Sequence, residues 1–182
     1  MNRAASVEGH DRLRLFCGFP LPATVLDGIV QWQSEQLGGR VVPRANLHVT
    51  LAFLGSRPSA DLAAVVDAVR ASAEGASAPT FRPLRYRETR SVGMLVLADE
   101  DDRATRIAAE LQERLEAIGV YRREKRPWLP HLTVLRFRAR PGFRPPVPDL
   151  GAFGPSDAAV YHSALRPGGA QYTVLESAAL GG

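Results

Sequence analysis

The sequence predicts an α+β fold in which two similar lobes face each other across a cleft. Segments typical of strands and of helices alternate along the 182 residues, which indicates a mixed architecture. The pattern His-x-Thr-x also occurs twice, at His48 and Thr50 and again at His131 and Thr133, each time inside a run typical of a buried strand. An internal duplication that has diverged explains both observations.

Four elements are expected in the first 75 residues. Apolar residues predict a strand over residues 13–19, and two prolines end it. Helical spacing of apolar residues predicts a helix over residues 23–37, and a pair of glycines ends it. The next strand, residues 47–54, carries the first motif. A second helix with one apolar face then begins near Ser59, which is a suitable N-cap residue.

The rest of the chain is expected to hold four more strands, a fifth that carries the second motif, and one helix. The helix has acidic residues at its start and a glycine at its end. A Pro-Gly-Gly turn joins the last two strands. In chain order, these elements are strands 81–88 and 92–98, helix 102–118, strand 131–138 with the second motif, a loop over 140–155, and strands 158–165 and 172–177.

The composition is typical of a globular protein, which we expect to form one two-lobed domain over residues 1–182. Hydrophobic residues make up 45% of the chain and charged residues 23%. Residues 1–12 lack apolar core positions, so we expect a flexible tail and no signal peptide. No apolar run is long enough to cross a membrane. Cys17, the single cysteine, is expected to be a small core residue of a cytoplasmic protein.

Arginine dominates the positive charge. The net charge of +4 and the pI of about 9.8 favour an anionic substrate. Arginine suits phosphate better than lysine does, although an arginine-rich genome would give the same excess. Of three basic clusters, the middle one precedes the second motif and is the leading candidate for contact with nucleic acid, with a solvated loop as the alternative. The clusters are Arg82, Arg85, Arg87 and Arg90; Arg122, Arg123, Lys125 and Arg126; and Arg136, Arg138 and Arg140.

Strand parity gives both motifs the same geometry. Successive side chains of a strand point to opposite faces, so His48 and Thr50 share one face while Val49 and Leu51 share the other. The second motif has the same alternation. Each strand therefore presents an imidazole and a hydroxyl together, with apolar side chains directed to the core.

A pair of histidines is suited to general acid and base catalysis on a phosphate. The unperturbed imidazole pKa of about 6.5 makes both protonation states usable near neutral pH. One histidine can take a proton from an attacking hydroxyl while the other gives a proton to a leaving oxygen. The hydroxyls of Thr50 and Thr133 can donate hydrogen bonds to the phosphate oxygens, where charge develops.

The alternative for each histidine is an ordinary structural role. A lone histidine on a strand is more often a hydrogen-bonded core or surface residue than a catalyst. The chain has four histidines, and two of them stand in matching contexts, which favours function for that pair. We expect His10, in the polar N-terminal segment, and His162, near a late strand, to be non-catalytic.

Four segments, spread from the first strand to the last, resemble a known family. They read RLF at residues 14–16, NLHVTLAFLG at residues 46–55, PHLTVLR at residues 130–136, and GAQY at residues 169–172. The family is that of the bacterial RNA 2′,3′-cyclic phosphodiesterases, also called 2′-5′ RNA ligases, within the two-histidine phosphoesterase superfamily. The resemblance implies two pseudo-symmetric antiparallel β-sheets around a central cleft, helices on the outside, and neither a metal nor another cofactor.

The resemblance also implies a substrate and a division of roles. RNA ends or small nucleotides bearing a 2′,3′-cyclic phosphate would be hydrolysed to a 2′-phosphate by a monomer. His48 would be the acid and His131 the base, while Thr50 and Thr133 would hold the phosphate oxygens. The family's arginine after the second motif corresponds to Arg136. Strict alternation turns Arg136 away from His131, so either the strand is bulged there or this arginine helps indirectly.

One departure from the family concerns base stacking. The family often has a tryptophan on the strand before the third helix, where this chain has Val96. Trp128 or Phe53 could stack a base instead, and either could equally be a core residue.

Three alternative functions remain open on the sequence. The same site would give 2′-5′ RNA ligation if the 5′-hydroxyl of another RNA replaced water. Metal-dependent hydrolysis needs carboxylates or further histidines beside the pair, and the motif strands contain none. A binding module for RNA or nucleotides would keep the fold without turnover, and the intact histidines and threonines argue against it.

Overall fold

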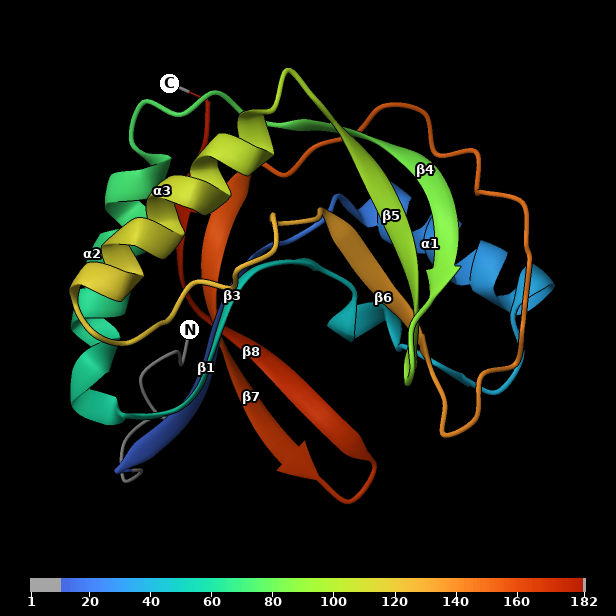
Figure 1. The fold of residues 1–182 in the computed structure, drawn as a ribbon, viewed down its shortest axis with the longest axis horizontal. Coiled ribbons are helices and arrows are strands. Elements are labelled where there is room, and N and C mark those ends of the chain that lie inside the picture. The colour runs from blue at the N-terminus through green and yellow to red at the C-terminus, as the bar shows by residue number, and fades with distance from the viewer. Residues whose placement is uncertain (1–10, 182) are drawn as a thin grey trace.

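The computed structural model describes residues 11–181, which form a mixed α and β fold (Figure 1). Two single-turn 3-10 helices, Arg44–Asn46 and Ser59–Asp61, precede β3 and α2 respectively. The strands are β1 (Arg12–Phe19), β2 (Arg40–Val41), β3 (Val49–Pro58), β4 (Thr80–Glu88), β5 (Val92–Glu100), β6 (His131–Arg136), β7 (Asp157–Arg166) and β8 (Gly169–Ala179). The helices are α1 (Ala23–Gln36), α2 (Leu62–Ala73) and α3 (Arg103–Ala117).

The strands form one curled antiparallel sheet with two halves. Its order is β4-β5-β6-β3-β1-β7-β8, and β2 pairs with the free side of β6 near its end. The halves meet where β3 pairs with β6, at Val49 opposite Leu132. The predicted α+β class is confirmed, with the refinement that the two expected sheets are joined through these central strands. The motif strands are therefore direct neighbours rather than walls facing each other at a distance.

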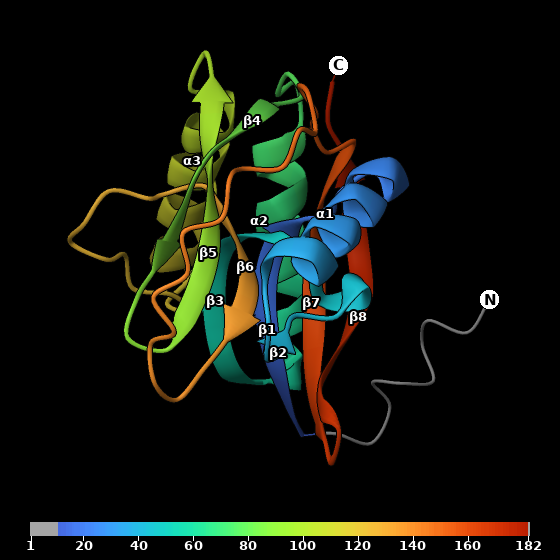
Figure 2. The same cartoon turned by 90° about the vertical axis from the view of Figure 1, so that its right-hand side faces the viewer.

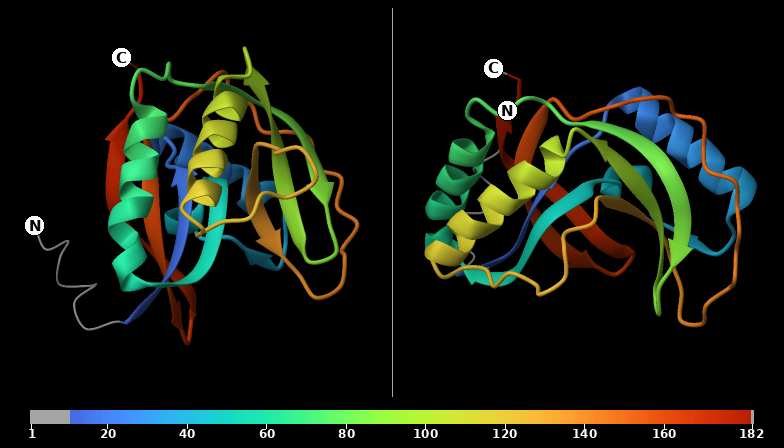
Figure 3. Two further views of the ribbon diagram at one scale, coloured as in Figure 1. Left: turned by 60° about the vertical axis from the view of Figure 1, so that its left-hand side comes forward. Right: turned by 45° about the horizontal axis from the view of Figure 1, so that its top comes forward.

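The helices lie on different sides of the strands. Figure 1 shows α2 and α3 beside β3, β7 and β8, with α1 behind β4, β5 and β6. The turned views agree that α1 is separated from the α2–α3 pair by the strands (Figure 2, Figure 3). Each helix buries one apolar face, and one hydrophobic cluster runs through both halves of the sheet. The motif strands thus rest on a continuous core.

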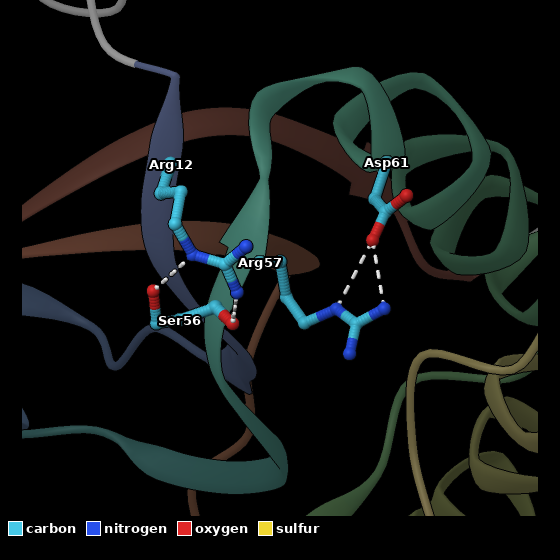
Figure 4. Close-up of polar contacts among 4 residues, drawn as sticks. All are labelled: Arg12, Ser56, Arg57 and Asp61. Atoms are coloured by element: carbon cyan, nitrogen blue, oxygen red, sulfur yellow. Dashed lines mark hydrogen bonds and ion pairs between the residues drawn. The ribbon is translucent and has the colours of Figure 1, made fainter.

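The first strand begins earlier than the sequence indicated. Arg12, expected in the flexible tail, pairs with Pro58 in the β1–β3 ladder. Its guanidinium donates to the side chain of Ser56 at 3.0 Å and to the Ser56 carbonyl oxygen at 2.9 Å (Figure 4). These two bonds extend β1 by one residue into the expected tail. Residues 1–10, including His10, lie outside the described residues.

The predicted N-cap at Ser59 is wrong. Ser59 opens the 3-10 turn that precedes α2, and the helix itself starts at Leu62. Asp61, at the cap position, makes no capping bond, because its carboxylate accepts two hydrogen bonds from Arg57 at 3.0 Å and 2.9 Å (Figure 4). An ion pair between β3 and the turn thus replaces the expected cap.

Two further expectations concern the burial of Cys17 and membrane-spanning helices. The Cys17 side chain is fully buried in β1, and burial raises the pKa of its thiol to about 12, so it is an inert core residue as predicted. In the part of the chain that the structure describes, none of the helices is long and apolar enough to span a membrane.

Candidate active site

The two motifs meet in one cavity. Because β3 and β6 are antiparallel, the pairing of Val49 with Leu132 sets His48 beside Thr133 and Thr50 beside His131. All four side chains line a cavity of about 600 Å³, which we call the first cavity. The alternate residues of both motifs are buried in the core, as parity predicted; they are Val49, Leu51, Leu132 and Val134.

The same kind of hydrogen bond, to a backbone carbonyl oxygen, orients both imidazoles. The Nδ1 atom of His48 lies 2.8 Å from the carbonyl oxygen of Asn46, and the Nδ1 atom of His131 lies 2.7 Å from that of Leu129. A carbonyl oxygen can only accept, so both Nδ1 atoms carry the proton. The Nε2 atom of each ring is then the one that can exchange a proton with a ligand. In His48 this atom lies 2.9 Å from the hydroxyl oxygen of Thr50, which can donate to it.

His48 is enclosed by aromatic rings. Its ring centroid lies 4.7 Å from that of Phe16, 5.7 Å from that of Tyr161 and 5.4 Å from that of Tyr172. Burial lowers the pKa of His48 to about 4; the bond to the Asn46 carbonyl opposes this shift, and electrostatic repulsion from the neighbouring His131 and Arg136 adds to it. At neutral pH, His48 is therefore uncharged in the free protein.

A bulge in each motif strand turns a further side chain into the site. In β6, Gly93 pairs with Leu135 but Met94 pairs with Thr133, so Val134 is the extra residue. The bulge reverses the parity, and Arg136 lines the first cavity with His131. This resolves the two possibilities that the sequence left for Arg136 in favour of a bulged strand.

The same irregularity recurs in β3. Cys17 pairs with Ala52 and Gly18 with Thr50, which leaves Leu51 as the extra residue. Phe53 is thereby turned toward the cavity, and its side chain is half exposed. Phe53 and Arg136 each stand five residues after their motif histidine, so they are equivalent positions of the two halves. The structure thus rules out a core role for Phe53.

Two buried glutamines, which the sequence reasoning missed, bind the bulged residues. Gln33 of α1 donates to the Val134 carbonyl oxygen at 2.8 Å, and Gln112 of α3 donates to the Leu51 carbonyl oxygen at 2.8 Å. Gln33 also donates to the Val42 carbonyl oxygen at 3.1 Å. A buried carbonyl without a partner is costly, so these bonds stabilise the bulges. Only the fold reveals them, because each glutamine is far from its partner in the sequence.

Arginines make the first cavity electropositive. Arg40 of β2 pairs with Arg136 of β6 in the ladder, and both side chains line the cavity. Like charges at directly opposite positions repel each other unless an anion lies between them. Arg14 also lines the cavity, with its guanidinium carbon 4.9 Å from the centre of the Phe53 ring. The sequence reasoning named neither Arg14 nor Arg40 as a site residue. Arg40 escaped it because β2 has only two residues and no pattern of its own.

The wall near His48 depends on two further residues. Asn46 donates from its side-chain amide to the Ala170 carbonyl oxygen at 2.8 Å, which ties the segment before His48 to the β7–β8 hairpin. A side chain at Gly18 would bring its Cβ within 2.7 Å of the Val49 carbonyl oxygen and 3.4 Å of the His48 ring. Glycine thus allows β1 to approach the first motif closely.

The remaining sequence candidates lie elsewhere. Trp128 does not line the first cavity; its indole nitrogen donates to the Thr50 carbonyl oxygen at 3.0 Å, and its ring lines a neighbouring cavity. Val96 is buried in β5. His162 lies in β7 and lines neither cavity. Across residues 11–181, no three His, Cys, Asp or Glu side chains are grouped so that they could hold a metal ion.

Comparison with known proteins assigns the family. The sequence profile of the 2′-5′ RNA ligase superfamily matches residues 20–165. The chain belongs to this superfamily. The resemblance stated from the sequence is thereby confirmed, and the match includes both histidine motifs and the residues between them.

Curated relatives and solved structures agree with that assignment. An RNA 2′,3′-cyclic phosphodiesterase of Thermus thermophilus is 31% identical over 93% of this chain and 91% of its own length. One of Escherichia coli K12 is 28% identical over 92% of this chain and 96% of its own. The structure of E. coli LigT with NADP+ has a TM-score of 0.82 at 27% identity, covering 95% of this chain and all of LigT. The Thermus protein TT0787 has a TM-score of 0.80 at 28% identity, covering 93% of this chain and 99% of its own.

Proposed function

We propose that this protein hydrolyses the 2′,3′-cyclic phosphate of RNA ends or small nucleotides to a 2′-phosphate, without a metal ion. The observation that carries the proposal is the arrangement of the two motifs: two histidines and two threonines from adjacent strands line one cavity. The names of the curated relatives, RNA 2′,3′-cyclic phosphodiesterases, support the choice of substrate. All these side chains come from one chain, so a monomer is sufficient.

In the proposed reaction, one histidine acts on each side of the phosphorus atom. His131 takes a proton from water as the water oxygen bonds to phosphorus, and the bond from phosphorus to the ribose 3′ oxygen breaks. His48 gives a proton to that leaving oxygen. The product is a 2′-phosphate with a free 3′-hydroxyl, and the two histidines exchange protons with solvent before the next turnover.

The acid role of His48 requires help from the substrate. With a pKa of about 4 in the free protein, His48 is neutral at the pH at which the enzyme would act. An anion bound next to an imidazole favours its protonated form and raises its pKa. Binding of the phosphate would therefore favour the protonated form of His48. Without bound substrate, His48 would remain neutral in these apolar surroundings.

The polar walls of the first cavity are suited to a single phosphate. Thr50 and Thr133 can donate to its non-bridging oxygens, and Arg40 and Arg136 can share its negative charge, which relieves their mutual repulsion. Ligation, in which the 5′-hydroxyl of a second RNA replaces water, would use the same groups. We propose hydrolysis as the main reaction because water is in large excess over any RNA end.

The experiment is product analysis in the presence of a chelator. An RNA ending in a 2′,3′-cyclic phosphate is incubated with the protein in excess EDTA, and the 2′- and 3′-phosphate products are separated. We expect complete conversion to the 2′-phosphate at the rate seen without EDTA. Activity that disappears with EDTA and returns with a divalent ion would refute the metal-independent mechanism. Binding of the RNA without any turnover would instead favour a nucleotide-binding module.

A further inference from the structure

A second cavity adjoins the first on the side of His131. It has a volume of about 640 Å³ and shares Thr50, Phe53 and His131 with the first cavity. Its other walls come from β3, β4, β5, the turn between β4 and β5, α3, and the segment between α3 and β6. The volume lies in the range of pockets for small organic ligands, and it can hold a nucleotide. The half-exposed ring of Phe53 stands between the two spaces.

The lining of the second cavity has the chemistry that a nucleic-acid strand requires. Arg87 of β4 and Arg126 of the segment before β6 contribute positive charge, and Tyr121 and Trp128 contribute aromatic rings. Arginines can bind backbone phosphates, and aromatic rings can stack on bases. The bond from the Trp128 indole nitrogen to the Thr50 carbonyl oxygen fixes that ring beside the motif strand. Glu124, the one acidic residue of this lining, forms an exposed ion pair with Arg126, which is weak enough to be exchanged for a phosphate.

The two histidines differ in which cavity they reach. His131 lines both cavities, whereas His48 lines only the first. In an in-line displacement, the attacking and leaving oxygens lie on opposite sides of phosphorus. The base must therefore stand where the attacking oxygen arrives. His131 is the proposed base, so the second cavity lies on the side from which a nucleophile would approach.

We propose that the second cavity binds the 5′-hydroxyl end of an RNA strand and presents this hydroxyl to the phosphate held in the first cavity. The inference rests on the proposed function and extends it to a second substrate strand. In the resulting step, the 5′ oxygen bonds to phosphorus and gives its proton to His131. The bond to the 3′ oxygen breaks, and that oxygen takes a proton from His48. The product is a 2′-5′ phosphodiester, and the same contacts act in its cleavage.

The test compares a double variant with a control that has the same change in charge. Arg87→Ala/Arg126→Ala removes both arginines of the second cavity. Arg106→Ala/Arg144→Ala removes two exposed arginines that line neither cavity and lie outside the three basic clusters. Each protein is assayed for hydrolysis of a mononucleotide 2′,3′-cyclic phosphate, with and without a trinucleotide that has a 5′-hydroxyl. Products joined by a 2′-5′ linkage are quantified in parallel.

We expect the trinucleotide to displace water and inhibit hydrolysis by the unmodified protein, with some 2′-5′ product. In the cavity variant, its inhibition constant rises about tenfold or more, as expected for the loss of charged hydrogen bonds, while mononucleotide hydrolysis alone stays unchanged. The control variant behaves as the unmodified protein does. Equal losses in both variants would overturn the inference, since general charge would then explain binding.

Two further outcomes are also decisive. An active enzyme that the trinucleotide neither inhibits nor uses as a substrate would overturn the second cavity as a strand site and leave the proposed hydrolysis standing. If the unmodified protein hydrolyses no cyclic phosphate, the proposed function itself fails, and this inference fails with it.

Discussion

At the scale of single residues, the two catalytic candidates share an orientation but differ in surroundings. Both imidazoles donate from Nδ1 to a backbone carbonyl two residues earlier, which leaves Nε2 for chemistry. His48 alone is packed against Phe16, Tyr161 and Tyr172. Burial among these rings lowers the pKa of His48, so this imidazole is neutral at neutral pH in the free protein. This difference can be detected in the stability of the folded protein as well as in its activity.

His48 should make the protein less stable in acid. The pKa of His48 is about 4 in the folded protein, against about 6.5 for an unperturbed imidazole in the unfolded chain. Between these values the unfolded chain binds more protons, so the free energy of unfolding falls as the pH is lowered from 6.5 toward 4. The loss is roughly 3 kcal/mol at most. Above the unfolded pKa this share of the stability is fully present.

The measurement is denaturant unfolding at several pH values for the protein and its His48→Gln variant. We expect the variant to lose less stability than the unmodified protein between pH 6.5 and pH 4. Parallel pH profiles of the two proteins would show that His48 is not the group that resists protonation.

At this scale, the sequence predicted the motif residues well and their helpers poorly. Alternation along a strand is a local property, so the common face of His48 and Thr50 could be read directly. Arg40 and Asn46 have no such signal, because Arg40 matters only through its pairing with Arg136 and Asn46 only through the β7–β8 hairpin. Their roles depend on strands that are distant in the chain.

At the scale of elements, the bulges in β3 and β6 decide which side chains reach the first cavity. Strict alternation would turn Arg136 away, and one extra residue at Val134 turns it inward. The position of a bulge could not be read from the motif, because the group that stabilises it comes from α1. Gln33 lies 101 residues from the carbonyl that it binds. The boundaries of most helices and strands, which depend on local patterns, were predicted closely.

Replacing Gln33 should therefore weaken phosphate binding from a distance. Gln33→Leu leaves the carbonyl oxygens of Val42 and Val134 without this donor, which should cost about 1–3 kcal/mol of stability. The bulge at Val134 then loses the hydrogen bond that stabilises it, and the Arg136 side chain is no longer held toward the first cavity. We expect KM for a cyclic nucleotide to rise several-fold with a smaller change in kcat. Gln31→Leu, an exposed position of the same helix, is the control.

A double-mutant cycle separates positioning from general damage. If Gln33 acts through Arg136, then Gln33→Leu should raise KM little further in an Arg136→Gln background. Additive effects on KM would mean that Gln33 affects the site by another route.

At the scale of the whole molecule, one strand pairing assembles the site. The two halves of the sheet are joined at Val49 and Leu132, and this register alone brings together residues that lie more than eighty positions apart. The sequence predicted two lobes around a cleft, and the repeated motif justified that prediction. The sequence could not show that the lobes share one sheet, because the pairing of β3 with β6 produces no recognisable pattern in either segment alone.

The most direct test of the account is the turnover of two cyclic substrates by His48→Ala and His131→Ala. One substrate is an ordinary 2′,3′-cyclic phosphate, and the other has sulfur in place of the 3′ bridging oxygen. We expect each variant to lose at least roughly a hundredfold on the oxygen substrate. A thiolate leaves without a proton, so His48→Ala should recover most of its rate on the sulfur substrate, while His131→Ala should not. Undiminished turnover of the oxygen substrate by either variant would contradict catalysis by paired histidines.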